Sequence, residues 1–183
     1  MGIRDRSGGV AASGGSLSNL MALVMARFIS GLETDPNAMF FASEDSHVSL
    51  SKSVRIMGLN QDALQIIPSD EEGKLDMTYL YSTFNKIRSE GKQCFAVVAT
   101  AGTTVRGAID PISDISKFCR DKNIWLHGDY CEKTYKNGYI IYGRSDATLN
   151  AGGIRLDINP VAWRRTDSTD AVGQVTFVYV RVN

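Results

Sequence analysis

The chain has 183 residues, of which 43% are hydrophobic and 22% are charged, a composition typical of a folded globular domain. Its 20 Lys and Arg residues balance 20 Asp and Glu residues, so no net charge favours nucleic acid or an anionic membrane surface. No stretch approaches the roughly 18 consecutive apolar residues of a membrane span, and a small molecule is therefore the expected partner.

The chain begins with a polar, charged segment, Met1 to Arg6, which has no apolar signal-peptide core. We interpret residues 1–7 as a leader unrelated to the fold. The three cysteines, Cys94, Cys119 and Cys131, are odd in number and show no CxxC spacing. This pattern argues against a disulfide framework or a structural zinc site and suits a reducing cytosol, so we expect a cytoplasmic protein.

Helices and strands are expected to alternate from residue 16 to residue 126. Apolar residues at helical spacing predict helices over 17–28, 46–57, 77–90 and 112–119, with Ser16 and Asp76 as N-caps of the first and third. Short apolar runs predict buried strands at 39–42, 63–67, 95–99 and 124–126. Asp110-Pro111 offers an N-cap and a first-turn proline for the last helix. This alternation predicts an α/β fold with a mostly parallel sheet and flanking helices.

The pattern changes close to residues 127–131. Asn137-Gly138 between two β-rich runs predicts a hairpin, because a type I′ turn needs positive φ at both central residues. Residues 145–153 are predicted to form a polar loop, 160–173 show no period, and 175–182 form a candidate terminal strand. We therefore expect a domain over residues 8–129 and a separate tail over 130–183.

Polar residues at the predicted element ends are candidates for a ligand site. Gly15 and Ser16 at a helix start suit a phosphate, although a glycine-rich cap without ligand is the more frequent explanation of such a pattern. His47 follows one strand, and Thr103 with Thr104 follows another; each is also a common structural feature of a turn. Asp129 ends the strand at 124–126, where open α/β sheets place ligands, and its alternative role is a helix cap or an ion pair.

Three blocks of the sequence closely resemble the pyridoxal-phosphate-dependent group II decarboxylases, the family of glutamate, cysteine-sulfinate and aromatic-amino-acid decarboxylases. They are GGVAASGGSLSNLMALVMARF, FASEDSHVSLSKSVRIMGL and VVATAGTTVRGAIDPISDISKFCRDKNIWLH, which together cover about residues 8–127. The resemblance implies part of the large domain of a fold-type I enzyme that decarboxylates an amino acid and forms a homodimer.

The same resemblance implies a role for each candidate residue. Gly15 and Ser16 would hold the cofactor phosphate, and His47 would stack on the pyridine ring. Thr104, together with Thr103, would lie near the cofactor and the substrate carboxylate, and Asp110 would support that turn. Asp129 would pair with the pyridine nitrogen. An anion is needed there because the ring withdraws the carbanion charge only while its nitrogen keeps its proton.

The sequence departs from the family pattern after His127. The family continues this strand as His-Val-Asp-Ala-Ala and later has an Asn-Pro-His-Lys motif whose lysine forms the Schiff base. Here the strand reads His127-Gly128-Asp129-Tyr130-Cys131, and the lysine motif does not occur in these 183 residues. We therefore expect a truncated or chimeric decarboxylase that binds the cofactor weakly and does not turn over; a non-catalytic remnant is the alternative.

The tail offers a different resemblance. HGDYCEKTYKNGYIIYGRSDATLNAGGIRL, about residues 127–156, is similar to the adenylate-forming acyl-CoA synthetases, and most to acetoacetyl-CoA synthetase. This similarity implies that Gly128 and Asp129 bind ribose, Arg144 contacts the nucleotide, and Asp146 lies near a hinge. An adenylate-forming fragment is therefore the runner-up function.

A metal site is a further alternative. Side chains alternate along a strand, so His127, Asp129 and Cys131 would share one face and, with His47, could bind a metal. The spacing fits no standard zinc motif, so no metal is expected.

Overall fold

The computed structural model describes residues 7–12, 14–103, 106–128, 130–133, 139–143, 148–151, 154–157 and 176–181; in the strands outside 14–128 it describes only the backbone path. The chain divides into two compact units. One comprises residues 23–128, and the other comprises residues 1–22 with residues 129–183. The boundary therefore falls inside the first helix, after Ala22.

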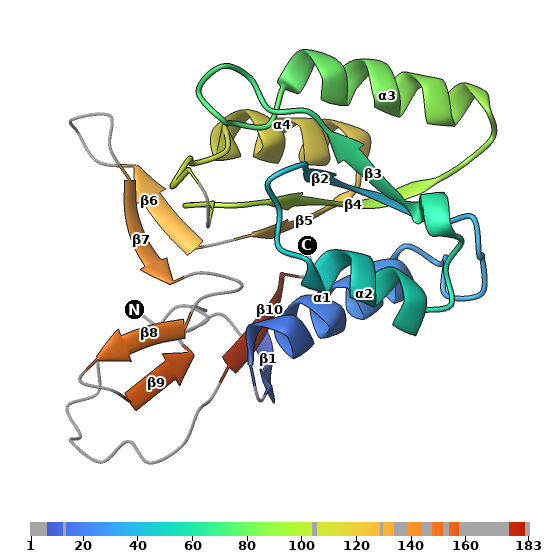
Figure 1. Cartoon of the computed structure of the whole chain (residues 1–183). Coiled ribbons are helices and arrows are strands. Elements are labelled where there is room, and N and C mark those ends of the chain that lie inside the picture. The colour runs from blue at the N-terminus through green and yellow to red at the C-terminus, as the bar shows by residue number, and fades with distance from the viewer. Residues whose placement is uncertain are drawn as a thin grey trace. The chain divides into compact units, whose positions relative to one another are not determined.

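The unit of residues 23–128 is built on a parallel sheet with strand order β3-β2-β4-β5 (Figure 1). Its strands are β2 (Met39–Ser43), β3 (Leu64–Ile67), β4 (Cys94–Ala99) and β5 (Trp125–Gly128). Val98 of β4 lies beside Ala42 of β2 on one side and beside His127 of β5 on the other. The expected strands and their parallel arrangement are confirmed.

Helices cover both faces of this sheet. They are α1 (Gly15–Ile29), α2 (Ser49–Ile56), α3 (Met77–Ser89) and α4 (Ile112–Lys122), with a 3₁₀ turn η1 (Gln61–Ala63) before β3. Leu23 of α1 and Leu50 of α2 pack in one hydrophobic cluster, whereas Leu80 of α3 and Phe118 of α4 pack in another. The α/β fold with helices on a parallel sheet is confirmed.

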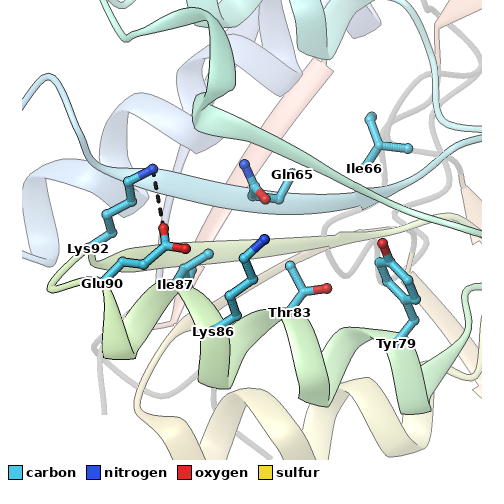
Figure 2. A pocket seen from close by; sticks show the side chains of 8 residues that line it. All are labelled: Gln65, Ile66, Tyr79, Thr83, Lys86, Ile87, Glu90 and Lys92. Carbon is cyan, nitrogen blue, oxygen red and sulfur yellow. Dashed lines mark ion pairs between the residues drawn. The ribbon is translucent and has the colours of Figure 1, made fainter.

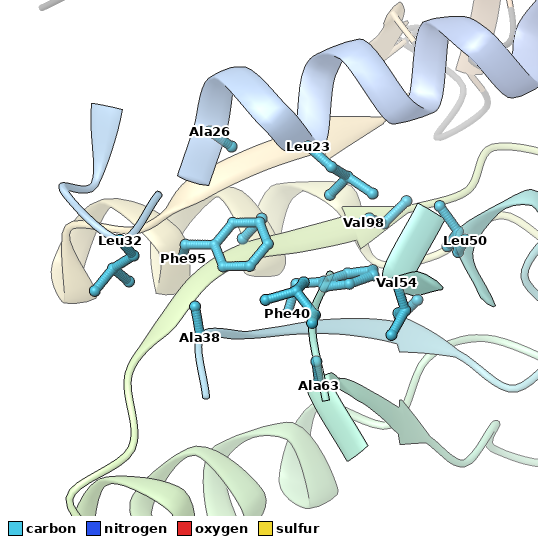
Figure 3. Packing of buried hydrophobic residues seen from close by; sticks show 13 residues of the cluster. Leu23, Ala26, Leu32, Ala38, Phe40, Leu50, Val54, Ala63, Phe95 and Val98 are labelled. Carbon is cyan, nitrogen blue, oxygen red and sulfur yellow. The ribbon is translucent and has the colours of Figure 1, made fainter. Parts of the chain in front are cut away.

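Buried side chains alternate between the two faces, because successive residues of a strand point in opposite directions. Phe40 packs in the cluster of α1 and α2, where its ring centroid lies 5.5 Å from that of Phe95 (Figure 3). Phe41 packs in the opposite cluster, 6.5 Å from Phe84, which in turn lies 5.3 Å from Phe118. Coverage of both faces explains why these strands are continuous apolar runs rather than alternating ones.

A buried arginine links the ends of α1 and α2. Arg27 is only 8% exposed. Its Nε donates to the carbonyl of Leu32 at 2.7 Å, Nη1 to Met57 at 2.8 Å and Nη2 to Asp35 at 2.8 Å. Each guanidinium nitrogen thus satisfies a carbonyl oxygen at or beyond a helix end, where the backbone has no intrahelical donor. The planar fork of donors suits this arrangement, which a single ammonium group could not reproduce.

The helix ends confirm some expected caps and correct another. The Asp76 carboxylate accepts from the amides of Thr78 at 2.7 Å and Tyr79 at 3.1 Å, so it caps α3 as predicted. Gly58, with φ +65°, follows the end of α2 as predicted. Ser16 is not the N-cap of α1, because that helix already begins at Gly15 and Ser16 lies in its first turn.

The other unit contains antiparallel pairs. β1 (Ser7–Ala12) pairs with β10 (Thr176–Arg181), β6 (Tyr130–Lys133) with β7 (Tyr139–Gly143), and β8 (Thr148–Ala151) with β9 (Ile154–Asp157). The antiparallel β6–β7 pair and the terminal strand are confirmed. The predicted two-residue connection at Asn137-Gly138 is wrong, because the register sets Lys133 opposite Tyr139 and leaves residues 134–138 between the strands. The expected loop over 145–153 is wrong at 148–151, and β1 was not anticipated.

No helix among the described residues combines the length and the apolar character needed to cross a bilayer.

Candidate functional site

The carboxyl ends of β2, β4 and β5 meet at one edge of the parallel sheet. Ser43, Ala99 and Gly128 are the last residues of these neighbouring strands. The segments that follow β2 and β4 carry two of the predicted site residues, His47 and Thr103. This edge, called the carboxyl edge below, is where open α/β sheets bind ligands. Thr104 and Asp129 lie outside the described residues, and their predicted roles remain predictions.

His47 lies in the turn between β2 and α2, and its ring orientation is fixed by the backbone. The amide of Ser49 donates to His47 Nδ1 at 3.1 Å, while the His47 carbonyl accepts from Leu50 N at 3.1 Å. Because Nδ1 accepts a hydrogen bond, a neutral ring carries its proton on Nε2. The side chain is partly exposed, which leaves ring surface available to a flat ligand.

A closed loop follows β4 and carries Thr103. The amides of Gly102 and Thr103 both donate to the Ala108 carbonyl at 2.9 Å, and Gly107 N donates to the Thr103 carbonyl at 2.8 Å. Thr103 is 3% exposed, and its Oγ1 accepts from Ala108 N at 3.1 Å. A threonine hydroxyl that accepts one hydrogen bond can also donate its own hydrogen. The role of Thr103 that the structure shows is therefore to hold this loop closed.

Asp110 anchors this loop and does not cap α4, which corrects the N-cap prediction. Its Oδ1 accepts from Leu75 N at 2.9 Å, its Oδ2 accepts from Thr100 N at 2.7 Å, and the side chain is 1% exposed. Pro111 occupies the N-cap position of α4 without a side-chain hydrogen bond. Asp110 thus joins the segments that follow β3 and β4. This geometry agrees with the supporting role that the family resemblance implies.

Burial raises the pKa of the Asp110 carboxyl above its ordinary value, against the opposing effect of hydrogen bonds from Thr100 and Leu75. The negative charges of Asp45 and Asp70 raise it further. The carboxylates near this edge therefore repel one another, and a cationic or hydrogen-bonding neighbour is favoured there.

Gly15 and Ser16 form the N-terminus of α1. The Ser18 amide donates to the Gly14 carbonyl at 3.0 Å, so the amides of Gly15, Ser16 and Leu17 precede this helical bond. The first turn contains no acidic residue. The backbone amides of a first helical turn and the positive end of the helix dipole suit a phosphate. These residues belong to the other compact unit, so their role in the same site as His47 remains a prediction.

His127 is a partly buried titratable group in β5, which the sequence singled out only as a possible metal ligand. It lies beside Val98 of β4, and burial lowers the pKa of its imidazole to about 4. The ring is therefore neutral at physiological pH. A neutral imidazole is compatible with an apolar sheet, whereas its protonated form is not.

Acidification from pH 7 to pH 5 is expected to destabilise the chain through His127. The unfolded imidazole binds a proton near pH 6.5 and the folded one only near pH 4, so stability is lost as pH falls through this window. The loss attributable to His127 is about 2 kcal/mol at pH 5. Urea unfolding of wild-type chain and His127→Gln at both pH values measures it. The measurement at pH 7 gives the cost of the substitution itself. An unchanged pH dependence in His127→Gln would contradict the assignment.

Gly128 allows β5 to approach β4 closely. A Cβ at this position would lie 2.6 Å from the Ala99 carbonyl oxygen, closer than real Cβ contacts. The glycine that interrupts the His-Val-Asp pattern of the family is therefore required by the strand pairing seen here. Valine at this position would force the end of β5 away from β4.

The metal alternative gains no geometric support from the described residues. Within them, no three His, Cys, Asp or Glu side chains gather in an arrangement that could hold a metal ion. The proposed ligand Asp129 and the side chain of Cys131 lie outside the described residues. The metal site thus stays an untested alternative.

A surface cavity of about 270 Å³ lies between β3 and α3 (Figure 2). Its polar lining includes both charges, and Lys92 and Glu90 pair at 3.6 Å across one end. It contains none of the predicted site residues; the lining consists of Gln65, Ile66, Tyr79, Thr83, Lys86, Ile87, Glu90 and Lys92. The cavity therefore does not extend the candidate site at the carboxyl edge.

Comparison with known proteins identifies the family. The model of the pyridoxal-dependent decarboxylase conserved domain matches residues 2–131. The chain belongs to this decarboxylase family. Human cysteine sulfinic acid decarboxylase is 36% identical over 162 residues, which are 85% of this chain and 32% of the relative. The aromatic-L-amino-acid decarboxylase of Bacillus atrophaeus is 33% identical over 129 residues, 70% of this chain and 27% of the relative.

Solved structures of decarboxylases share the fold. The crystal structure of mouse CSAD superposes with a TM-score of 0.62 and 34% identity, covering 66% of this chain and 27% of that one. The chain thus spans only about a third of the curated relatives it matches, or less. This confirms the prediction of a partial fold-type I domain, and the sites of whole decarboxylases are not all represented in it.

The match to the human decarboxylase bears on the tail. A match over 85% of 183 residues cannot stop at residue 131, so it extends into the segment after β5. That segment is where the similarity to acetoacetyl-CoA synthetase was noted. The synthetase resemblance and the seam at 127–131 remain predictions.

Proposed function

We propose that this chain is part of a pyridoxal-phosphate-dependent amino acid decarboxylase, a carboxy-lyase, and that its carboxyl edge forms the floor of the cofactor site. The observation that carries the proposal is the placement of His47 and Thr103 directly after adjacent parallel strands, in a chain of the pyridoxal-dependent decarboxylase family. The described residues fit the group: an oriented, partly exposed imidazole and a threonine hydroxyl at one sheet edge.

Each residue has a defined task in this proposal. His47 presents a ring face to the pyridine, and the Ser49 amide prevents that ring from turning. Thr103 holds its loop in place, Thr104 reaches the cofactor and substrate carboxylate, and Asp129 holds the proton of the pyridine nitrogen. Pyridoxal phosphate, when bound, withdraws the electron pair that remains on Cα as carbon dioxide leaves.

Substrate, assembly and location complete the proposal. The substrate is an amino acid, since the relatives are cysteine sulfinic acid and aromatic amino acid decarboxylases. A homodimer follows from the family resemblance. A cytoplasmic location is supported by free Cys94 and Cys119; burial raises the pKa of the Cys119 thiol to about 12, so it stays protonated. No nucleic-acid or membrane partner is proposed.

The test uses 4′-deoxypyridoxine 5′-phosphate, which has the ring and phosphate of the cofactor but no aldehyde to react with surface lysines. We expect saturable, weak binding to the 183-residue chain, measured by calorimetry. His47→Ala should lower the affinity roughly fivefold, because an aromatic contact contributes about 1 kcal/mol. His47→Phe should retain most of the affinity. Equal binding by wild type and His47→Ala would contradict the proposed site.

Turnover is tested separately. The purified 183-residue chain with pyridoxal phosphate should release no carbon dioxide from L-amino acids, because it lacks the family's lysine motif. Release above that of free cofactor would contradict this expectation.

A further inference from the structure

One arginine links three loops that follow strands of the parallel sheet: it lies in one loop and contacts the other two. Arg106 lies in the loop after β4, and its Nε is 3.4 Å from Asp45 Oδ2 in the turn after β2. Its aliphatic stem lies over the turn after β3: a Cβ on Gly73 would be 2.8 Å from Arg106 Cδ. Gly73 also has φ +79°, a conformation that side chains rarely adopt. Because Gly73 has no side chain, the turn leaves room for the aliphatic stem of Arg106.

The two partners of this ion pair have unequal surroundings. The Asp45 side chain is 16% exposed and Arg106 is 50% exposed. Asp45 Oδ2 is covered and has no hydrogen-bond partner among the described residues. Arg106 is thus the cation that compensates this carboxylate, whereas Arg106 itself remains hydrated. Loss of the arginine should therefore be more harmful than loss of the carboxylate.

The pair joins the segments that carry the proposed cofactor residues. His47 is two residues after Asp45, and the Ser46 amide between them donates to the Ser43 carbonyl at 3.0 Å. Arg106 lies inside the loop that is closed by the hydrogen bond from Gly107 N to the Thr103 carbonyl. Movement of either segment alone would separate the charges.

We propose that Asp45 and Arg106 form a positioning clamp that fixes the His47 turn against the Thr103 loop. Only the purpose of the clamp rests on the proposed function: the clamp would align the His47 imidazole, which stacks on the cofactor ring, with the floor of the cofactor site. The clamp itself is a property of the chain without ligand. Neither residue is catalytic; both act through His47 and Thr103.

Hydrogen exchange of the full 183-residue chain, followed by NMR, tests the clamp. The reporters are the amides of Ser46 and Gly107, one in each joined segment, and Leu80 in α3 serves as an internal reference. Arg106→Gln should accelerate exchange at both reporters roughly tenfold, and Asp45→Asn by roughly threefold, with Leu80 unchanged. The reporter amides of the double variant should exchange no faster than those of Asp45→Asn, because the covered Asp45 carboxylate, which needs a compensating cation, is then absent.

Two further variants separate the clamp from a simple surface ion pair. Arg106→Lys restores the cation and should return exchange to about threefold of wild type or less. Lys92→Gln removes exposed pairs with Asp62 at 3.1 Å and Glu90 at 3.6 Å and should change neither reporter. Exchange that rises only in the mutated segment, or strictly additive effects of the two single substitutions, would overturn the clamp.

The histidine spectrum adds a readout of position. The chain has two histidines, so its imidazole nitrogen signals are readily assigned. Arg106→Gln should shift the His47 signals and leave those of His127 in place; unmoved His47 signals would overturn the positioning role. Failure of the analogue to bind wild-type chain would remove the proposed cofactor function but not the clamp, since exchange is measured without ligand.

Discussion

Replacing Arg27 with methionine is expected to lower the free energy of unfolding by about 3 kcal/mol, the largest effect we predict for a single side chain. Methionine fills similar space but removes the charged donors of the Leu32, Asp35 and Met57 carbonyls. The Leu32 and Asp35 carbonyls keep the longer hydrogen bonds from Asp35 N at 3.2 Å and Ala38 N at 3.3 Å, so the largest loss is expected at Met57. An unpaired buried polar group costs about 1 to 3 kcal/mol. Arg27→Lys should lose about 2 kcal/mol, because an ammonium group cannot reach all three oxygens in one plane.

Urea unfolding followed by circular dichroism measures these values. Arg120→Ala is the matched control, because Arg120 lies exposed near the end of α4 and its loss should change stability by no more than about 0.5 kcal/mol. A midpoint for Arg27→Met equal to that of the control would show that the three hydrogen bonds contribute nothing net.

Asp110→Asn is expected to destabilise the chain by about 2 kcal/mol and to release the loop after β4. Both Asp110 oxygens accept from backbone amides, whereas asparagine offers one oxygen and turns an NH₂ donor toward the other amide. Thr103 should lose its position as a result, and binding of the deoxypyridoxine phosphate analogue should fall with stability. Asp114→Asn, an exposed substitution in the first turn of α4, is the control.

The effect of Asp110 should depend on pH with an unusual sign. The pKa of the Asp110 carboxyl is raised in the folded chain. The folded chain therefore keeps the carboxyl proton at pH values at which the unfolded chain has already released it. The contribution of Asp110 to stability is therefore greatest below its unfolded pKa and declines as pH rises through the folded value. The stability difference between wild type and Asp110→Asn should decrease as pH rises from about 4. A difference that increases with pH would show that the hydrogen bonds outweigh burial.

The regular elements of the sheet unit were predictable because local signals agree with tertiary burial. Strands such as β4 are apolar throughout, and they are buried on both faces. Asp76 was recognised as a cap because its partners, Thr78 and Tyr79, are its immediate neighbours in sequence. His47 and Thr103 were located correctly at the carboxyl edge for the same reason: each follows a clear strand.

The errors concern residues whose partners are distant in sequence. Asp110 matches the local pattern of an N-cap, but Leu75, which it binds, is 35 positions away. Nothing in the local sequence of the helix at 17–28 indicates what Arg27 binds, and only the fold brings the Met57 carbonyl to it. The Asp45 and Arg106 pair was missed because nothing in either segment points to the other.

The β8–β9 pair is a different kind of error, because its signal was local. Gly152-Gly153 stands between two short runs that alternate polar and apolar residues, a pattern typical of a two-residue hairpin. The glycines were instead interpreted as part of a loop. The segment is polar overall, and its alternation was outweighed by its composition.

The strand order of the sheet also has a consequence for synthesis of the chain. β2, whose five residues are all buried, lies between β3 and β4, and its register with β4 joins Met39 to Cys94. As the chain leaves the ribosome, β3 becomes available soon after β2, but one side of β2 stays open until β4 follows. A strand that is fully buried in the folded chain thus exposes an unpaired edge during translation, when aggregation competes with folding. Helix α3, which forms from local contacts before β4 emerges, can cover one face of β2 but not that edge.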